Sequence, residues 1–212
     1  MEQDEQSEVV AFLSRAASYG VADAVERIDT HAARVFLAGP CAYKLKRAVH
    51  YPYLDFSTAE KRRQACEAEL RLNRRTAPDL YLEVRAVRRD PGGGLSFAQG
   101  EPVDWLVVMQ RFPARDLLAE VAGRGALDAP LVRALADRIA AFHAGAEIRR
   151  SGGEEALRRV IDGNRASMEQ VADLLPGAPA DALRRRSIAL LEDLAPGLDR
   201  RAREGPGRQC HG

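Results

Sequence analysis

In the first half of the chain, short apolar runs alternate with turn residues, a pattern typical of β-strands. Before them, apolar residues recur at helical spacing between Val9 and Ala17 and stop at Gly20, which predicts an opening amphipathic helix. The runs that follow predict strands over 25–28, 34–37, 41–47, 81–87, 95–97 and 103–109. Ala38-Gly39-Pro40 predicts a tight hairpin between the second and third of them.

A single helix is expected between the third and fourth strands. Ser57-Thr58-Ala59-Glu60 has the form of a capping box with Ser57 at the cap, and the helix that it opens should run to about Arg75. In the strand 103–109, which is apolar without alternation, Trp105 and Val107 should face one side of the sheet and Leu106 and Val108 the other. The predicted fold class is therefore α+β, with a small antiparallel sheet and an inserted helix.

After Phe112 the pattern becomes helical. Asp128 and Pro130 begin a helix whose apolar stripe includes Leu135 and Ile139. Two more helices are expected, one over the stripe from Leu157 to Val171 and one over roughly Asp181 to Leu194. The pattern therefore predicts a strand-rich part, residues 1–109, followed by a helical part, residues 110–212, with residues 103–112 connecting the two.

Composition narrows the function classes. The formal net charge of +1, from 32 basic and 31 acidic residues, gives no bulk field that favours nucleic acid, and no apolar run is long enough to cross a membrane. Three cysteines without Cys-x-x-Cys spacing argue against a disulfide framework and a zinc site, so a cytoplasmic location is expected. Only three of the basic residues are lysines, which makes each lysine worth attention.

Two of those lysines, Lys44 and Lys46, are two residues apart on a predicted strand and so should project from one face, with Ala42 beside them. Their acidic partner could be Glu67 or Glu69. Glu67 is surrounded by arginines at helical spacing, as on a solvated face, whereas Glu69 has mostly small or apolar neighbours and should lie on the packed stripe. We therefore expect Glu69 to pair with Lys44, more closely than with Lys46.

The residues just described are similar to those of a known family. The run from Thr30 through Val35-Phe36-Leu37-Ala38-Gly39, Tyr43-Lys44-Leu45-Lys46-Arg47, Tyr53-Leu54-Asp55-Phe56-Ser57 and Glu69-Leu70-Arg71-Leu72-Asn73 resembles the bacterial aminoglycoside-phosphotransferase-like family of the protein-kinase-like superfamily. The resemblance implies a two-lobe kinase-like fold, with residues 1–109 as the nucleotide-binding lobe and residues 110–212 as an incomplete helical lobe. It also implies transfer of the γ-phosphoryl group of ATP, with Mg²⁺, to the hydroxyl of a small molecule.

The resemblance further implies roles for individual residues. Lys44 would hold phosphates of ATP and Glu69 would orient Lys44, while Lys46 is the alternative phosphate-binding lysine. Ala42 would lie against adenine, Gln110 would belong to the hinge whose backbone binds adenine, and the Thr30 hydroxyl could cap phosphates. Members of this family are often fused to a carboxy-terminal P-loop ATP-binding domain, so a fused or missing domain of that kind is a further expectation.

The last residues, Cys210-His211-Gly212, resemble the start of the family's catalytic loop. The catalytic Asp and the metal ligands would then follow Gly212, so no catalytic or metal-binding residue is assigned within the chain. As written, the chain is expected to be a fragment that binds nucleotide and transfers phosphate negligibly. The alternative interpretation is a non-catalytic nucleotide-binding or interaction module, that is, a degenerate kinase.

Overall fold

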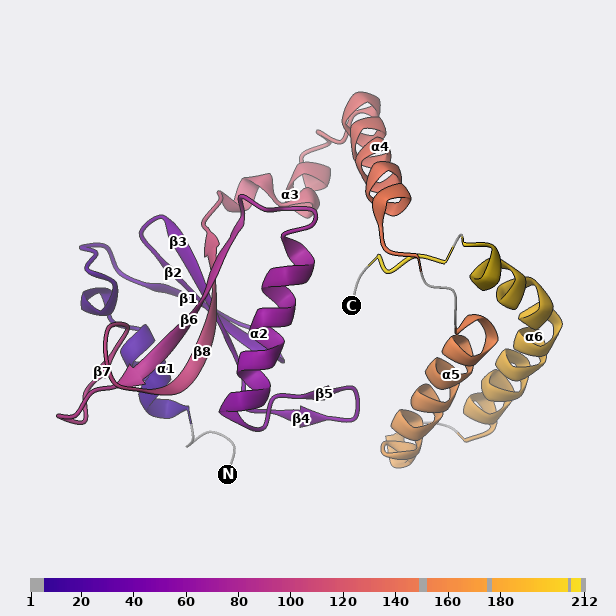
Figure 1. Ribbon diagram of the computed structural model, residues 1–212, viewed down its shortest axis with the longest axis horizontal. Coiled ribbons are helices and arrows are strands. Elements are labelled where there is room, and N and C mark those ends of the chain that lie inside the picture. Colours follow the sequence, from indigo (N-terminus) through magenta and orange to yellow (C-terminus); the bar gives the residue numbers. More distant parts are fainter. Residues whose placement is uncertain (1–5, 149–151, 175–176, 206, 211–212) are drawn as a thin grey trace. The chain divides into compact units, whose positions relative to one another are not determined.

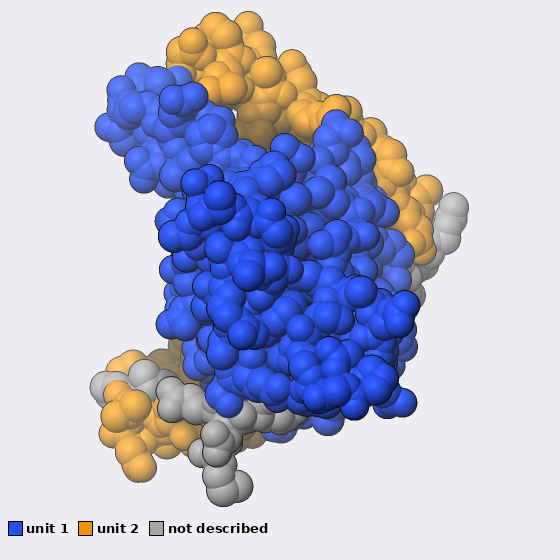
Figure 2. All heavy atoms as spheres, turned by 90° about the vertical axis from the view of Figure 1, so that its left-hand side faces the viewer, with its two compact units in different colours: residues 1–127 blue, residues 128–212 orange. Residues whose placement is uncertain are grey.

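The structure is a computed structural model that describes residues 6–148, 152–174, 177–205 and 207–210. It divides into two compact units, residues 1–127 and 128–212 (Figures 1 and 2). Unit 1 carries an antiparallel sheet with helices, whereas unit 2 is helical. The predicted α+β class is confirmed, and the kinase-like arrangement stays a prediction, as does the functional boundary at residue 109.

The sheet of unit 1 has six antiparallel strands in the order β1-β2-β3-β8-β6-β7. The two central strands, β3 and β8, pair from Cys41 opposite Gln110 to Leu45 opposite Leu106. The expected hairpin joins β2 to β3, where Gly39 adopts a φ of +53° that side chains disfavour. The strands span β1 Glu26–Asp29, β2 Ala33–Ala38, β3 Cys41–Lys46, β6 Tyr81–Arg89, β7 Leu95–Ser96 and β8 Glu101–Gln110.

The two faces of this sheet are covered by different helices. On one face, α1 (Ser7–Leu13) packs its Phe12 and Leu13 into a core that includes Tyr43, Leu45, Leu106 and Val108. This core also includes the aromatic ring of Phe97, which lies edge-on to Phe12. Strand alternation therefore leaves Ala42, Lys44, Lys46, Trp105 and Val107 for the other face, as the sequence predicted.

That other face is covered by α2 (Ala59–Asn73) (Figure 1). The cap is Thr58, not Ser57 as expected: Thr58 has extended backbone and its hydroxyl accepts a hydrogen bond from Lys61 N at 3.2 Å. The Ser57 hydroxyl instead donates to Asp55 at 2.6 Å. Asp55 belongs to a two-stranded hairpin that the sequence did not reveal, formed by β4 (His50–Tyr51) and β5 (Leu54–Asp55).

The rest of the described chain is mainly helical. As expected, the Asp128 carboxylate caps α4 (Ala129–Gly145) by accepting a hydrogen bond from Leu131 N at 2.8 Å. The last helix runs on to Glu204, well past the expected end at Leu194, and Pro196 lies inside it. A proline removes one backbone donor but does not by itself end a helix. The remaining elements are η1 Ala16–Tyr19, η2 Ala114–Asp116, α3 Leu118–Gly123, α4 Ala129–Gly145, α5 Gly153–Glu169, η3 Ala172–Leu174 and α6 Gly177–Glu204.

The fold predicts that Leu45 anchors β3. Its side chain is 0% exposed, between two residues that face α2, so Leu45→Ala should lower the free energy of unfolding by about 2–5 kcal/mol in urea titrations. The matched control is Leu82→Ala on β6. Because Leu82 is 36% exposed, this truncation should lower the free energy of unfolding much less. Equal losses in the two variants would contradict the assignment of Leu45 to the core.

Candidate functional site

The candidate site lies where α2 packs on the sheet, and the packed stripe of α2 is polar. Arg62, Cys66 and Glu69 are four and three residues apart, so they share one side of the helix. Arg62 and Cys66 are buried and Glu69 is largely so. A helix that buries charged groups requires charged partners on the sheet beneath it.

Glu69 finds those partners in both lysines of β3. Its Oε1 accepts a hydrogen bond from Lys44 Nζ at 2.9 Å, and its Oε2 accepts one from Lys46 Nζ at 2.6 Å. The expected pairing of Lys44 with Glu69 is therefore present, but the expectation that Lys44 is the nearer lysine is wrong. The reason is depth: the Lys46 side chain is 8% exposed and lies under α2, whereas that of Lys44 is 31% exposed.

The cluster contains more positive than negative charges. Two ammonium groups face one carboxylate, which leaves one excess positive charge, and the Lys46 ammonium also lies 4.9 Å from the centre of the Phe56 ring. Burial raises the pKa of Glu69, but the positive charges of Lys46 and Lys44 and their hydrogen bonds outweigh it, so this pKa lies below its usual value. Glu69 is thus held ionised.

Glu67 behaves as the sequence predicted. It lies on the outer side of α2 and pairs with Arg63 at 2.6 Å, with both side chains substantially exposed. Exposed pairs of this spacing contribute only a few tenths of a kcal/mol.

Tyr81 is a neighbour of the cluster that sequence reasoning missed. It begins β6 and pairs with Met109, which pairs in turn with Ala42, so the three form one row across the sheet. Burial raises the pKa of Tyr81, and the negative charge of Glu69 raises it further. In the sequence, the only sign of a role for Tyr81 was its position at the start of a predicted strand.

The other predicted site residues are placed as follows. Ala42 is buried on the same face as Lys44. The Thr30 hydroxyl is engaged in the turn between β1 and β2, where it donates to Ala33 O and accepts from Ala33 N, both at 3.0 Å. Gln110 ends β8 and its backbone N donates to Leu80 O at 2.8 Å. Among the described residues, neither Thr30 nor Gln110 hydrogen-bonds to the cluster.

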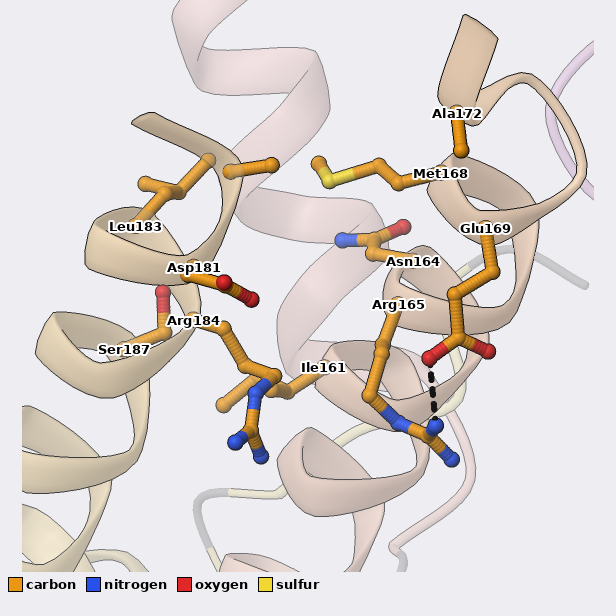
Figure 3. A pocket seen from close by; sticks show the side chains of 11 residues that line it. Ile161, Asn164, Arg165, Met168, Glu169, Ala172, Asp181, Leu183, Arg184 and Ser187 are labelled. Atoms are coloured by element: carbon orange, nitrogen blue, oxygen red, sulfur yellow. Dashed lines mark hydrogen bonds and ion pairs between the residues drawn. The ribbon is translucent and has the colours of Figure 1, made fainter. Parts of the chain in front are cut away.

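Unit 2 has a concave site of its own between α5 and α6, with a volume of about 450 Å³. Asn164 and Met168 project into it from α5, and Asp181 and Arg184 from α6 (Figure 3). At its edge Arg165 pairs with Glu169 at 2.8 Å. Apolar and polar residues line it in about equal number, and its polar residues are exposed except Ser187, which is half-buried.

Within the described ranges, no group of three or more His, Cys, Asp or Glu side chains is arranged to hold a metal ion. None of the helices in that part of the chain combines the length and apolar character needed to cross a bilayer. His211 and Gly212, which the sequence assigned to the start of a catalytic loop, lie outside the described residues.

Similarity to known proteins extends over most of this chain but not over most of its relatives. "Uncharacterized protein Rv2004c" of Mycobacterium tuberculosis and "Uncharacterized protein Mb2027c" of Mycobacterium bovis are each 36% identical to it over 161 residues. The alignment covers 74% of this chain and 30% of each relative, so the chain spans about a third of the length of the curated relatives it matches. No protein-family model matches the chain, and no solved structure matches it significantly.

Cys66 offers a test of how α2 packs. Its thiol is buried and donates to Trp105 O at 3.7 Å, and burial raises the pKa of this thiol to about 12. Because the thiolate is the reactive form, iodoacetamide at pH 8 should leave Cys66 unmodified in the folded protein. Mass spectrometry should show alkylation of the partly exposed Cys41 first, and of Cys66 only after unfolding. Alkylation of Cys66 at the rate of Cys41 would contradict this packing.

The ionised state of Glu69 predicts a pH-dependent stability. Because its folded pKa is lowered, its contribution is fully present above the unfolded value of about 4.3 and is lost as pH falls through the folded pKa. Glu69→Gln should therefore lower the free energy of unfolding by about 3 kcal/mol near pH 7, with the difference from wild type shrinking below pH 4.

Urea titrations between pH 3 and 7 measure this difference. Glu67→Gln is the matched control on the exposed side of the same helix and should change stability little at any of these pH values. A Glu69 difference that stays constant down to pH 3 would contradict an ionised, paired Glu69.

Proposed function

We propose that unit 1 binds ATP through its phosphates, with Lys44 as the phosphate-binding lysine and Glu69 as the residue that orients it. The observation that carries this proposal is the cluster in which Lys44 and Lys46 share Glu69 under α2. Its excess positive charge suits the anionic phosphates of a nucleotide, which an ammonium binds as a point charge.

The exposure of the two lysines supports a division of roles. The Lys44 ammonium is accessible enough to exchange Glu69 for a phosphate oxygen, whereas the Lys46 ammonium is buried beneath the helix. If Lys44 turns to a phosphate, Glu69 still has Lys46 as its partner, so its charge is not left unpaired. Ala42 and Tyr81 lie in the same region of the sheet and would border the bound nucleotide.

The arrangement of elements supports a wider proposal. An antiparallel sheet whose third strand carries the lysines, followed by a helix that carries their acidic partner, is the layout expected of a kinase-like nucleotide lobe. The function proposed for the protein to which this lobe belongs is transfer of the γ-phosphoryl group of ATP to a small-molecule hydroxyl in the cytoplasm, as in the aminoglycoside-phosphotransferase-like family. Mg²⁺ would arrive with the phosphates of ATP, and no residue of this chain is assigned to it.

A second candidate function is a nucleotide-binding module without catalysis. Its basis is that the cluster by itself supports binding under either proposal, since a carboxylate held by two ammonium groups is a poor proton acceptor. The groups of the cluster thus serve binding, and none of them is available as a general base.

The binding proposal predicts the effect of Lys44→Ala. Loss of one charge-assisted contact to phosphate should weaken ATP binding by about ten- to a hundredfold in isothermal titration calorimetry. Lys61→Ala is the matched control, because Lys61 is the remaining lysine, lies on α2, and pairs with Asp55 away from the cluster.

The same titrations test the role assigned to each lysine. Lys46→Ala should lower stability more than Lys44→Ala does, because it removes a buried partner of Glu69. Unchanged ATP affinity in Lys44→Ala would remove Lys44 from the site. Acceptor-dependent consumption of ATP by the longest natural form of the protein would favour the phosphotransferase, and nucleotide binding without turnover would favour the module.

A further inference from the structure

A second buried ion pair lies on the same stripe of α2 as Glu69. Arg62 Nε donates to Asp104 Oδ1 at 2.8 Å, and both side chains are 1% exposed. Arg62 Nη1 also donates to Phe56 O at 3.0 Å. One guanidinium therefore joins the first turns of α2 to β8 and to the segment that enters the helix.

Asp104 connects this pair to the lysine strand. Its Oδ2 accepts a hydrogen bond from Gln6 Nε2 at 2.7 Å, and the same amide group donates to Lys46 O at 2.9 Å. Gln6 Oε1 accepts from Ala48 N at 2.9 Å. The network thus holds the backbone of β3 at Lys46, directly beneath the cluster that Glu69 completes.

The spacing of Arg62 and Glu69 determines how firmly α2 is held on the sheet. They are seven residues apart, so they lie on one side of α2 about two turns, or roughly 10 Å, apart. A helix attached at one point can pivot about that point, whereas attachment at two points fixes its rotation and its position along the sheet. Cys66 lies between the two attachments on the helix and is 0% exposed.

We propose that Arg62 is a positioning residue, whose buried pair with Asp104 fixes α2 on the sheet and thereby sets where Glu69 holds Lys44. The attachment at Glu69 includes a solvent-accessible member, Lys44, that an anionic ligand can draw away, but the attachment at Arg62 does not. Arg62 keeps Glu69 in place during that exchange. The nucleotide part of this inference rests on the proposed function, and the positioning of Lys44 and Lys46 does not.

The test compares Arg62→Lys and Arg62→Met with Val87→Ala. Lysine keeps a charge for Asp104 but cannot also reach Phe56 O in the same way, and methionine removes the charge. Val87 is the matched control, because it belongs to the apolar core and lies opposite Asp104 in the pairing of β6 with β8. Its truncation therefore costs stability at the same place in the sheet while leaving the bond between Arg62 and Asp104 intact. All proteins are compared under conditions in which circular dichroism shows them folded.

The first readout is the side-chain spectrum of the lysines. With ¹³C-lysine labelling the chain gives only three lysine spin systems, from Lys44, Lys46 and the more exposed Lys61, which single Lys→Arg variants assign. We expect the Lys44 and Lys46 signals to move toward the position of Lys61 in both Arg62 variants, further in Arg62→Met than in Arg62→Lys, and to stay in place in Val87→Ala. Alkylation of Cys66 should accelerate in the same order.

The second readout is ATP affinity, which should fall on the order of tenfold in Arg62→Met, less in Arg62→Lys, and not in Val87→Ala. Unmoved lysine signals in a folded Arg62→Lys protein, or equal movement in Val87→Ala, would overturn the inference. If Arg62→Met does not fold, Arg62→Lys decides. If wild type binds no ATP, the proposed function fails, and the lysine signals with Cys66 alkylation still decide the positioning role.

Discussion

The packing of α2 depends on matching charges that have been removed from water. An ionised group transferred into the protein interior costs several kcal/mol unless a partner and hydrogen bonds replace its hydration. Glu69 and Arg62 both meet this condition through residues of the sheet, Lys44 and Lys46 in one case and Asp104 in the other. The helix can therefore sit on the sheet only in a position that satisfies both groups together.

This constraint distinguishes the two faces of the sheet. The face covered by α1 is an apolar core built around Phe36, Leu45 and Leu106, which tolerates small shifts of side chains because its attraction is not directional. The face covered by α2 is specified by hydrogen-bond distances between charged groups. A site that must present one ammonium group in a defined direction is better built on the second kind of face.

The sequence predicts the parts of this site that depend on local periodicity. Strand alternation places Lys44 and Lys46 on one face, and the neighbours of Glu67 and Glu69 separate the exposed acid from the buried one. Arg62 was not predicted, because it stands in the run Lys61-Arg62-Arg63 and looks like part of a solvated surface. Its burial is set by Asp104, which is distant in sequence, and no local pattern reports such a partner.

Which of the two lysines is nearer to Glu69 could not be predicted from local patterns either, and the answer bears on their roles. Alternation gives the face on which a side chain lies but not how deeply the helix covers it, so it did not predict that Lys46 is nearer to Glu69. Proximity to the carboxylate is also a poor guide to ligand binding. Lys46 makes the shorter contact because α2 covers it, and for the same reason its ammonium group is not accessible to solvent. Lys44, with the longer contact and the greater exposure, is the lysine that can change partners, and therefore the one suited to a phosphate.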